Sequence, residues 1–233
     1  MPSPYSTGGG GTHFEARVAA AYLAAVLCEA PARGLPGQQA KAVRTQTAAH
    51  GEPLDDIVVE GSFADGRATK LSLQVKSEVR FTSNDPEWVA VVQAAWDTFA
   101  QPDFDVALHR VGLAIANYDA KIDKYYQSVL TWATHSADAA DFFQRIGKRD
   151  FSHAEKRNLV EAIQTILTAY LGRAVAADEL WRFLRSFVIL HFDLNCQTAR
   201  NRDPLSAPKR DPFSLSSSGE ARSPQRAQRV AAG

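Results

Sequence analysis

The stretch LDDIVVEGSFADGRATKLSLQVK, residues 54–76, contains two strand-like runs with a turn signal between them. The first run, 57–59, is apolar and β-branched, as is typical of strands. Asp65 and Gly66 form an Asp-Gly pair, which favours a tight hairpin turn. The second run, 70–76, alternates between apolar and polar residues, the period-two pattern of a half-buried strand. The stretch therefore predicts a β-hairpin.

This hairpin would bring hard oxygen ligands and a cation together. Gln74 and Lys76 are two residues apart on the second strand, so their side chains lie on one face. Asp55 and Asp56 come directly before the first strand, which places them beside these two residues. A divalent ion takes oxygen ligands, which Asp56, the Gln74 side chain and the Val75 carbonyl can supply. Lys76 can hold and polarise a water or hydroxide, and these are the parts of metal-assisted phosphodiester hydrolysis.

The pattern resembles the PD-(D/E)xK superfamily of restriction-endonuclease-like nucleases: a carboxylate, a spacer with a β-turn, then Glu or Gln, any residue and Lys. Here it reads Asp56, the hairpin and Gln74-Val75-Lys76, and the Gln resembles the Mrr-like branch. Asp55 stands where the pattern nominally has Pro, which leaves the choice of primary ligand open between the two aspartates. We favour Asp56 because it directly precedes the apolar strand. The alternative interpretation is an ordinary hairpin with solvated polar residues.

Periodicity around the hairpin predicts further elements. A helix over 12–28 and a strand over 41–50 precede it, and a helix over 85–100 and a strand over 110–116 follow it. Asp85 and Pro86 are typical of a helix start, with Asp85 as the N-cap and Glu87 in the first turn. The order helix, three strands, helix, strand is the αβββαβ core of the superfamily that the motif resembles. We therefore expect an α/β fold with a restriction-endonuclease-like core and a mixed sheet.

Glu15 in the first helix has two interpretations. Thr12 and Glu15 have the spacing of a capping box, so the carboxylate could serve the helix start. The phrase GTHFEARV, residues 11–18, also resembles the opening helix of related nucleases, which often place a Glu near the metal. The resemblance therefore adds Glu15 to the candidate catalytic residues Asp56, Gln74 and Lys76.

The remaining chain divides by composition into four expected segments. These are a flexible Pro/Ser/Gly arm over 1–11, the nuclease core over 12–130, a helical extension over 131–198 and a disordered tail over 199–233. The apolar run 187–192 within the extension is either a last strand or a linker. The tail carries seven Lys/Arg and three Asp/Glu and few large apolar residues, so it cannot offset its ordering entropy by burial.

Composition excludes several classes of protein. Cys28 and Cys196 are far apart and form no CxxC pattern, which argues against zinc. No apolar run approaches the ~18 residues of a membrane span, and no signal-peptide pattern opens the chain. We therefore expect a microbial cytoplasmic protein with no membrane partner. The formal net charge is zero, so a nucleic-acid partner would have to meet a local basic patch.

The segment 73–99 resembles the double-stranded DNA nuclease domains at the N-terminus of bacterial anti-phage defence proteins. This resemblance implies Mg²⁺- or Mn²⁺-dependent endonucleolytic cleavage of duplex DNA, and Asp56, Gln74, Val75 and Asp55 are the candidate metal ligands. It also implies an NTPase or sensor partner and a homo-oligomer in the active state. The alternative is a catalytically inactive module that keeps the fold for DNA binding or assembly.

Overall fold

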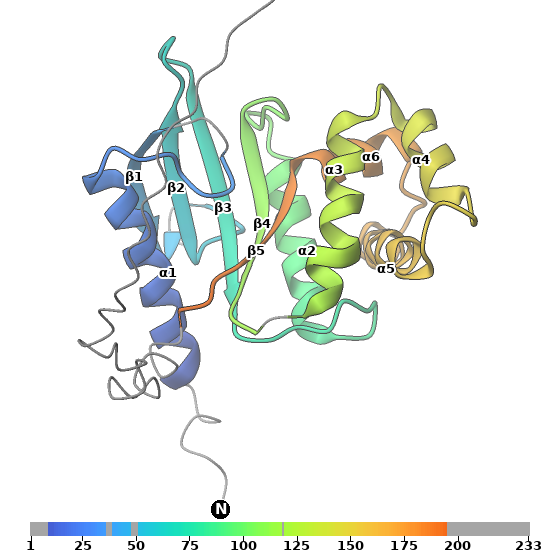
Figure 1. The fold of residues 1–233 in the computed structure, drawn as a ribbon, viewed down its shortest axis with the longest axis horizontal. Coiled ribbons are helices and arrows are strands. Elements are labelled where there is room, and N and C mark those ends of the chain that lie inside the picture. The colour runs from blue at the N-terminus through green and yellow to red at the C-terminus, as the bar shows by residue number, and fades with distance from the viewer. Residues whose placement is uncertain (1–8, 36–38, 48–50, 118, 195–233) are drawn as a thin grey trace, which may run out of the picture. The chain divides into compact units, whose positions relative to one another are not determined.

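The structure is a computed structural model that describes residues 9–35, 39–47, 51–117 and 119–194. Its five-stranded sheet has the order β1-β2-β3-β4-β5. The strands are β1 (Gln39–Thr45), β2 (Ile57–Ser62), β3 (Ala68–Lys76), β4 (His109–Ile115) and β5 (Phe187–His191). Neighbours are antiparallel from β1 to β3 and parallel from β3 to β5. Helices lie on both sides of the sheet (Figure 1), so the fold is α/β with a mixed sheet, as expected.

The predicted hairpin is the pair β2 and β3. Gly66 in its turn takes φ +84°, a left-handed conformation that glycine adopts without steric cost. The antiparallel register pairs Ile57 with Leu73. Asp56 comes one residue before Ile57, and Gln74 one residue after Leu73. The register therefore places the candidate acid opposite the candidate amide.

Helix α1 (Gly9–Leu27) covers one face of the sheet (Figure 1). Its buried residues pack with alternate residues of β3, Leu71 and Leu73, in one apolar cluster. Val75 packs against the same cluster. Because side chains alternate along a strand, Gln74 and Lys76 project from the opposite face.

Helix α2 (Pro86–Phe99) packs on the second face of the sheet. Asp85 caps it as predicted: its Oδ1 accepts a hydrogen bond of 2.8 Å from the N–H of Trp88. Trp88 and Trp96 are 0% and 5% exposed, so both are core residues. The later helices join α2 in the larger apolar cluster. They are the π-helix η3 (Ile122–Tyr126), α3 (Gln127–His135), α4 (Ala139–Gly147), α5 (Ala154–Leu171) and α6 (Ala177–Ser186).

The apolar run 187–192 forms a strand rather than a linker. β5 pairs with β4 in parallel register, with Gly112 opposite Val188. A β-carbon at Gly112 would lie 1.9 Å from the Val188 carbonyl oxygen, so this approach requires a glycine. The segment 131–198, expected as a helical extension, therefore also completes the sheet.

Two expected boundaries are wrong. Helix α1 begins at Gly9, so Thr12 lies inside the helix and is not its N-cap. Gly9, Gly10 and Gly11 belong to the helix and not to an arm, since glycine can adopt helical dihedrals at a modest entropic cost. Strand β1 ends at Thr45, five residues early, because Gln46 takes φ +54° and leaves the extended conformation.

The expected tail over 199–233 and most of the expected arm lie outside the described residues. Within the ranges given above, no helix is both long enough and apolar enough to cross a membrane.

Candidate active site

The carboxylate of Asp56 joins the start of β2 to the end of β3. Its Oδ2 accepts a hydrogen bond of 2.5 Å from Nε2 of Gln74 and another of 2.7 Å from the backbone N–H of Val75. No donor in the described part of the chain contacts Oδ1. One oxygen of Asp56 is thus fixed by the hairpin, and the other is available to a ligand.

The Val75 carbonyl faces the same space. In a strand, the N–H and C=O of one residue leave the backbone on the same edge. The Val75 N–H points to Asp56, and β2 ends its pairing at Leu73. The Val75 carbonyl therefore lies on the unpaired edge beside Asp56. The amide of Gln74 presents its nitrogen to Asp56, and a half-turn of the amide would present its oxygen instead.

Lys76 lies on the same strand face as Gln74 but has a partner on another element. Its Nζ lies 2.7 Å from Oε2 of Glu87, in the first turn of α2. The two side chains are 28% and 55% exposed, so the pair is accessible to water. The charge of Lys76 also reaches Asp56, whose pKa it lowers, though less than other influences.

Glu15 approaches the site from α1. Burial raises the pKa of Glu15 above its usual value, and the charges of Asp56 and Asp55 raise it further. Burial likewise raises the pKa of Asp56, against the lowering effect of its hydrogen bond from Val75. The charge of Asp55 adds to this rise. The carboxylate of Glu15 on α1 is therefore close enough to the two aspartates before β2 to be affected by their charges. Glu15 is not a capping residue, because its helix begins at Gly9.

The two aspartates occupy different environments. The backbone carbonyl of Asp55 accepts a hydrogen bond of 2.9 Å from the N–H of Thr47, which fixes the turn before β2. The Asp55 side chain makes no hydrogen bond to the described residues. Asp56 alone contacts Gln74 and Val75, so the structure brings together the set that the motif names around Asp56.

The donor set is compatible with a hard divalent ion. No group of three or more His, Cys, Asp or Glu side chains within residues 9–194, gaps excepted, is arranged to hold a metal. The set expected here has a different composition: the Asp56 carboxylate, the Gln74 amide oxygen and the Val75 carbonyl. Mg²⁺ keeps several waters and needs one or two carboxylates, so this set suffices. Burial raises the pKa values of Asp56 and Glu15, and neighbouring carboxylates add to the rise, so a cation here would stabilise both charged forms.

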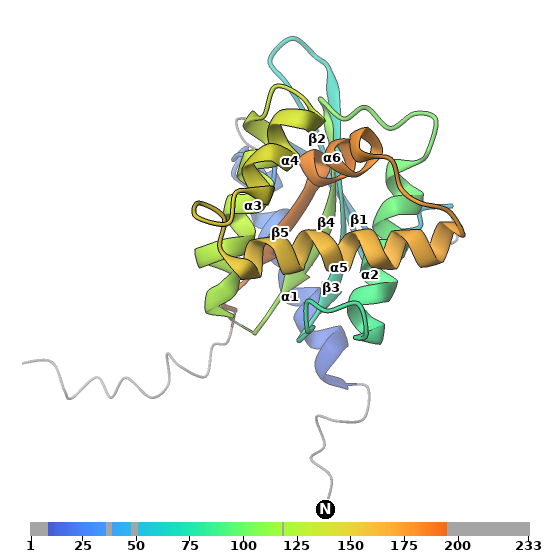
Figure 2. The same ribbon diagram turned by 90° about the vertical axis from the view of Figure 1, so that its right-hand side faces the viewer.

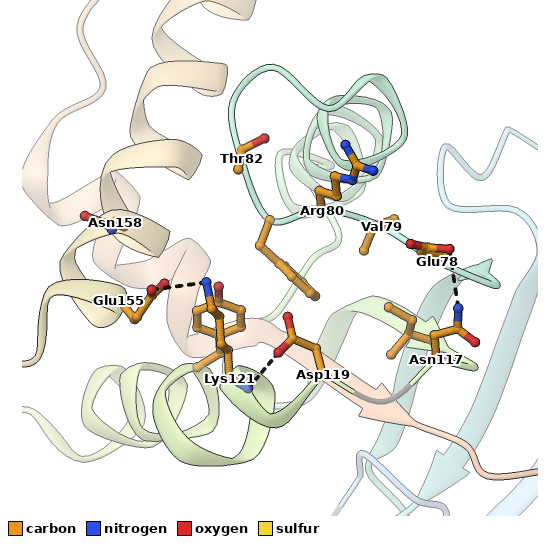
Figure 3. A pocket seen from close by; sticks show the side chains of 12 residues that line it. Glu78, Val79, Arg80, Thr82, Asn117, Asp119, Lys121, Glu155 and Asn158 are labelled. Carbon is orange, nitrogen blue, oxygen red and sulfur yellow. Dashed lines mark hydrogen bonds and ion pairs between the residues drawn. The ribbon is translucent and has the colours of Figure 1, made fainter.

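A cavity of about 650 Å³ opens at the carboxyl ends of β3 and β4 (Figure 3). It begins at Glu78, two residues beyond Lys76, where Asn117 donates a hydrogen bond of 3.4 Å to the Glu78 carboxylate. Lys121 and Glu155 form an ion pair of 3.1 Å at another part of its wall. Arg80 and Asp119 also line it, so three acids face two cations. This balance does not favour a polyanion inside the cavity.

Sequence reasoning missed two features of this region. The sequence indicates that Glu87 is a first-turn acid of a helix, but its contact with Lys76 depends on how α2 packs against the end of β3. The cavity joins the end of β3 to η3 and α5, which are distant in sequence. One sequence signal bears on the contact between Lys76 and Glu87. The Asp-Pro-Glu sequence at 85–87 indicates that a helix begins ten residues after Lys76, with an acid in its first turn.

Comparison with protein-family models, with curated proteins and with solved structures found no match. We therefore infer a function from the chemistry of the site.

Proposed function

We propose that the chain is a metal-dependent endonuclease that hydrolyses phosphodiester bonds of double-stranded DNA. The observation that carries the proposal is the position of Asp56, held by Gln74 and Val75 with one oxygen available. The element order α1-β1-β2-β3-α2-β4 supports a restriction-endonuclease-like core. The choice of duplex DNA, and a role as an effector of bacterial antiviral defence, rest on the resemblance of residues 73–99 described above.

In this proposal Mg²⁺ or Mn²⁺ supplies Lewis-acid stabilisation of charge on the phosphate. Asp56, the Gln74 side-chain oxygen and the Val75 carbonyl hold the ion. Lys76 leaves Glu87, orients the attacking water and stabilises its developing negative charge. The water oxygen forms a bond to phosphorus as one P–O bond of the backbone breaks. The products are a phosphate monoester and a hydroxyl, and the water supplies both protons.

A second candidate is a non-catalytic module that uses the same fold for DNA binding or assembly. The observation that favours it is that Asp56 and Lys76 already have protein partners, Gln74 and Glu87. A hairpin whose polar groups satisfy one another needs no metal to be stable. The two candidates differ in whether phosphodiester bonds break.

Nicking of supercoiled plasmid in Mg²⁺, in Mn²⁺ and in EDTA tests the proposal. We expect cleavage with either metal, none in EDTA, and none by Asp56→Asn. Asp65→Asn is the matched control, because Asp65 lies in the same hairpin and pairs with Arg67 on the exposed turn. Loss of cleavage in Asp55→Asn but not in Asp56→Asn would reverse the choice of ligand. If both variants cut normally, the non-catalytic module is the better conclusion.

A further inference from the structure

Two stacked pairs of rings join η3 and α3 to the start of α5. Tyr125 stacks on His153 with ring centroids 4.2 Å apart and 16° between the planes. Trp132 stacks on Phe151 with centroids 5.1 Å apart and 12° between the planes. Tyr125 lies in η3 and Trp132 in α3, which follows it directly, and both rings stack on residues that lie just before α5. Figure 2 shows α5 running across α2 and beside α3.

Phe151 is the exposed end of its stack. Phe151 lies in the loop between α4 and α5, and its side chain is 62% exposed. The neighbouring Ser152 is buried instead, and His153 caps α5 by accepting a hydrogen bond of 3.3 Å from the N–H of Glu155. The Phe151 ring therefore has one face on Trp132 and presents the other to solvent, where a further planar ring can stack.

Cations surround these rings. Lys156 lies 4.0 Å from the Trp132 centroid, and Lys124 lies 5.3 Å from the Tyr125 centroid. Lys148 and Arg149 are exposed just before Phe151. None of these four side chains forms an ion pair with the residues that the structure describes.

The segment 148–157 has four Lys/Arg against two Asp/Glu, a net charge of +2. We call the four rings and four cations the aromatic–basic patch. The adjoining cavity contains more acids than cations, so the patch is the better partner for phosphate.

We propose that the aromatic–basic patch binds an unpaired stretch of DNA strand, with a base stacked on Phe151 and the flanking phosphates on Lys148 and Arg149. Aromatic faces beside unpaired cations suit single strands, because every base has a π-face and every linkage carries a charge. Bases inside a duplex are already stacked on one another and cannot reach Phe151. The exposed ring therefore selects for strand that is not paired.

The patch lies near the candidate active site. Lys121 and Glu155, at the edge of the patch, line the same cavity as Glu78, which follows Lys76 by two residues. Figure 3 shows these two groups on different sides of the cavity. The patch and the end of β3 thus adjoin the same cavity, although its acidic lining does not favour a strand inside it. The choice of DNA over RNA rests on the proposed function, whereas binding of an unpaired strand does not depend on cleavage.

Fluorescence anisotropy with a labelled single-stranded DNA oligonucleotide, in EDTA to prevent cleavage, tests the inference. We expect the single strand to bind more tightly than a duplex of the same sequence. Phe151→Ala should weaken binding about 5- to 150-fold, the range that stacking of one base supplies. Phe151→Trp should restore it. Tyr170→Ala is the matched control, because Tyr170 is also an exposed aromatic residue but lies at the far end of α5.

The contribution of Lys148 and Arg149 to binding is measured separately, from the salt dependence of the affinity. The double variant Lys148→Glu, Arg149→Glu should make the fall of log affinity with log salt concentration less steep. The slope should lose about 1.4 of its magnitude, since each phosphate contact contributes ~0.7 on a single strand. Arg182→Glu, at an exposed position of α6, should not change this slope. An unchanged melting temperature in each variant would establish that the fold is intact.

Three outcomes would overturn the inference. The first is equal binding by Phe151→Ala and Tyr170→Ala. The second is no preference for the single strand over the duplex. The third is Phe151-dependent binding of single-stranded RNA without binding of DNA. In that case the patch would bind an unpaired strand, but DNA would not be its partner. Asp56→Asn should bind the oligonucleotide normally, so a failure of cleavage and a failure of the patch are distinguishable.

Discussion

The ammonium of Lys76 lies 2.7 Å from the carboxylate of Glu87, which joins the end of β3 to the first turn of α2. Glu87 thereby restrains the side chain of Lys76, and both members of the ion pair remain accessible to water. Exposed ion pairs contribute about 0.2–1 kcal/mol, so Lys76 can exchange this partner for another at small cost.

We expect Glu87→Gln to increase the rate of plasmid cleavage by up to about fivefold. The lysine would no longer have to leave an ion pair, and ~1 kcal/mol corresponds to roughly that factor in rate. Single-turnover cleavage in saturating Mg²⁺ is the measurement. A decrease in rate would mean instead that Glu87 positions Lys76 for the reaction.

Lys76→Ala should reduce cleavage by about 10²–10³, the usual loss on removing a group that stabilises developing charge. The melting temperature should change little, because Lys76 is partly exposed and its ion pair is weak. Lys41→Ala, at an exposed position of β1, is the control for loss of a lysine from the same sheet. Undiminished cleavage by Lys76→Ala would reject the mechanism.

The raised pKa of Asp56 makes a prediction about stability without metal. The folded state holds this proton more tightly than the unfolded chain, so stability falls as pH rises from the ordinary value of 3.8 through the raised one. Asp56→Asn should therefore raise the melting temperature at pH 7 in EDTA.

This advantage of Asp56→Asn should shrink toward pH 4, where the wild-type carboxyl is increasingly protonated. Mg²⁺ should raise the melting temperature of the wild type and leave that of the variant unchanged. Equal melting temperatures for the two proteins at pH 7 would show that burial of the Asp56 charge costs little stability.

Gln74→Glu should lower the melting temperature in EDTA and increase the stabilisation by Mg²⁺. The substitution replaces a donor that lies 2.5 Å from Asp56 with a second carboxylate, and like charges at this distance repel strongly. A divalent ion between them would reverse the effect. We expect cleavage to persist at lower Mg²⁺ concentrations than in the wild type. A variant with neither change would indicate that Gln74 does not face a metal.

The packing of α6 and β5 against α2 predicts where the chain can be shortened. Phe183 and Phe187 pack against the Trp96 and Trp88 rings, with centroids 5.4 and 5.8 Å apart. A chain ending at residue 130, the expected end of the nuclease core, loses these contacts. It should show no cooperative thermal unfolding, whereas a chain ending at residue 194 should unfold cooperatively. Cooperative unfolding of the shorter chain would show that the first four strands are sufficient.

The local elements could be predicted because short patterns determine them. Period-two alternation defines β3, the Asp65-Gly66 pair defines its turn, and Asp85 defines the start of α2. The same local information placed Asp56 near Gln74, since an antiparallel hairpin fixes its own register.

Features that depend on packing could not be predicted. The partner of Lys76 is set by the position of α2, and the end of β1 by the left-handed conformation of Gln46. The start of α1 depends on whether glycines join a helix that tertiary contacts stabilise, which no local signal decides. The stacking of Phe151 on Trp132 joins a loop to a helix across α4.

The position of β5 has a consequence for synthesis of the protein. The residues of the candidate site leave the ribosome early, but the strand that completes the sheet follows only after β4 and six helical segments. Until then β4 has an open edge, and the apolar side of α2 lacks Phe183 and Phe187. A half-made chain would carry the site residues without the sheet that holds them. Under the proposed function, this order would delay cleavage of DNA until β5 has been synthesised.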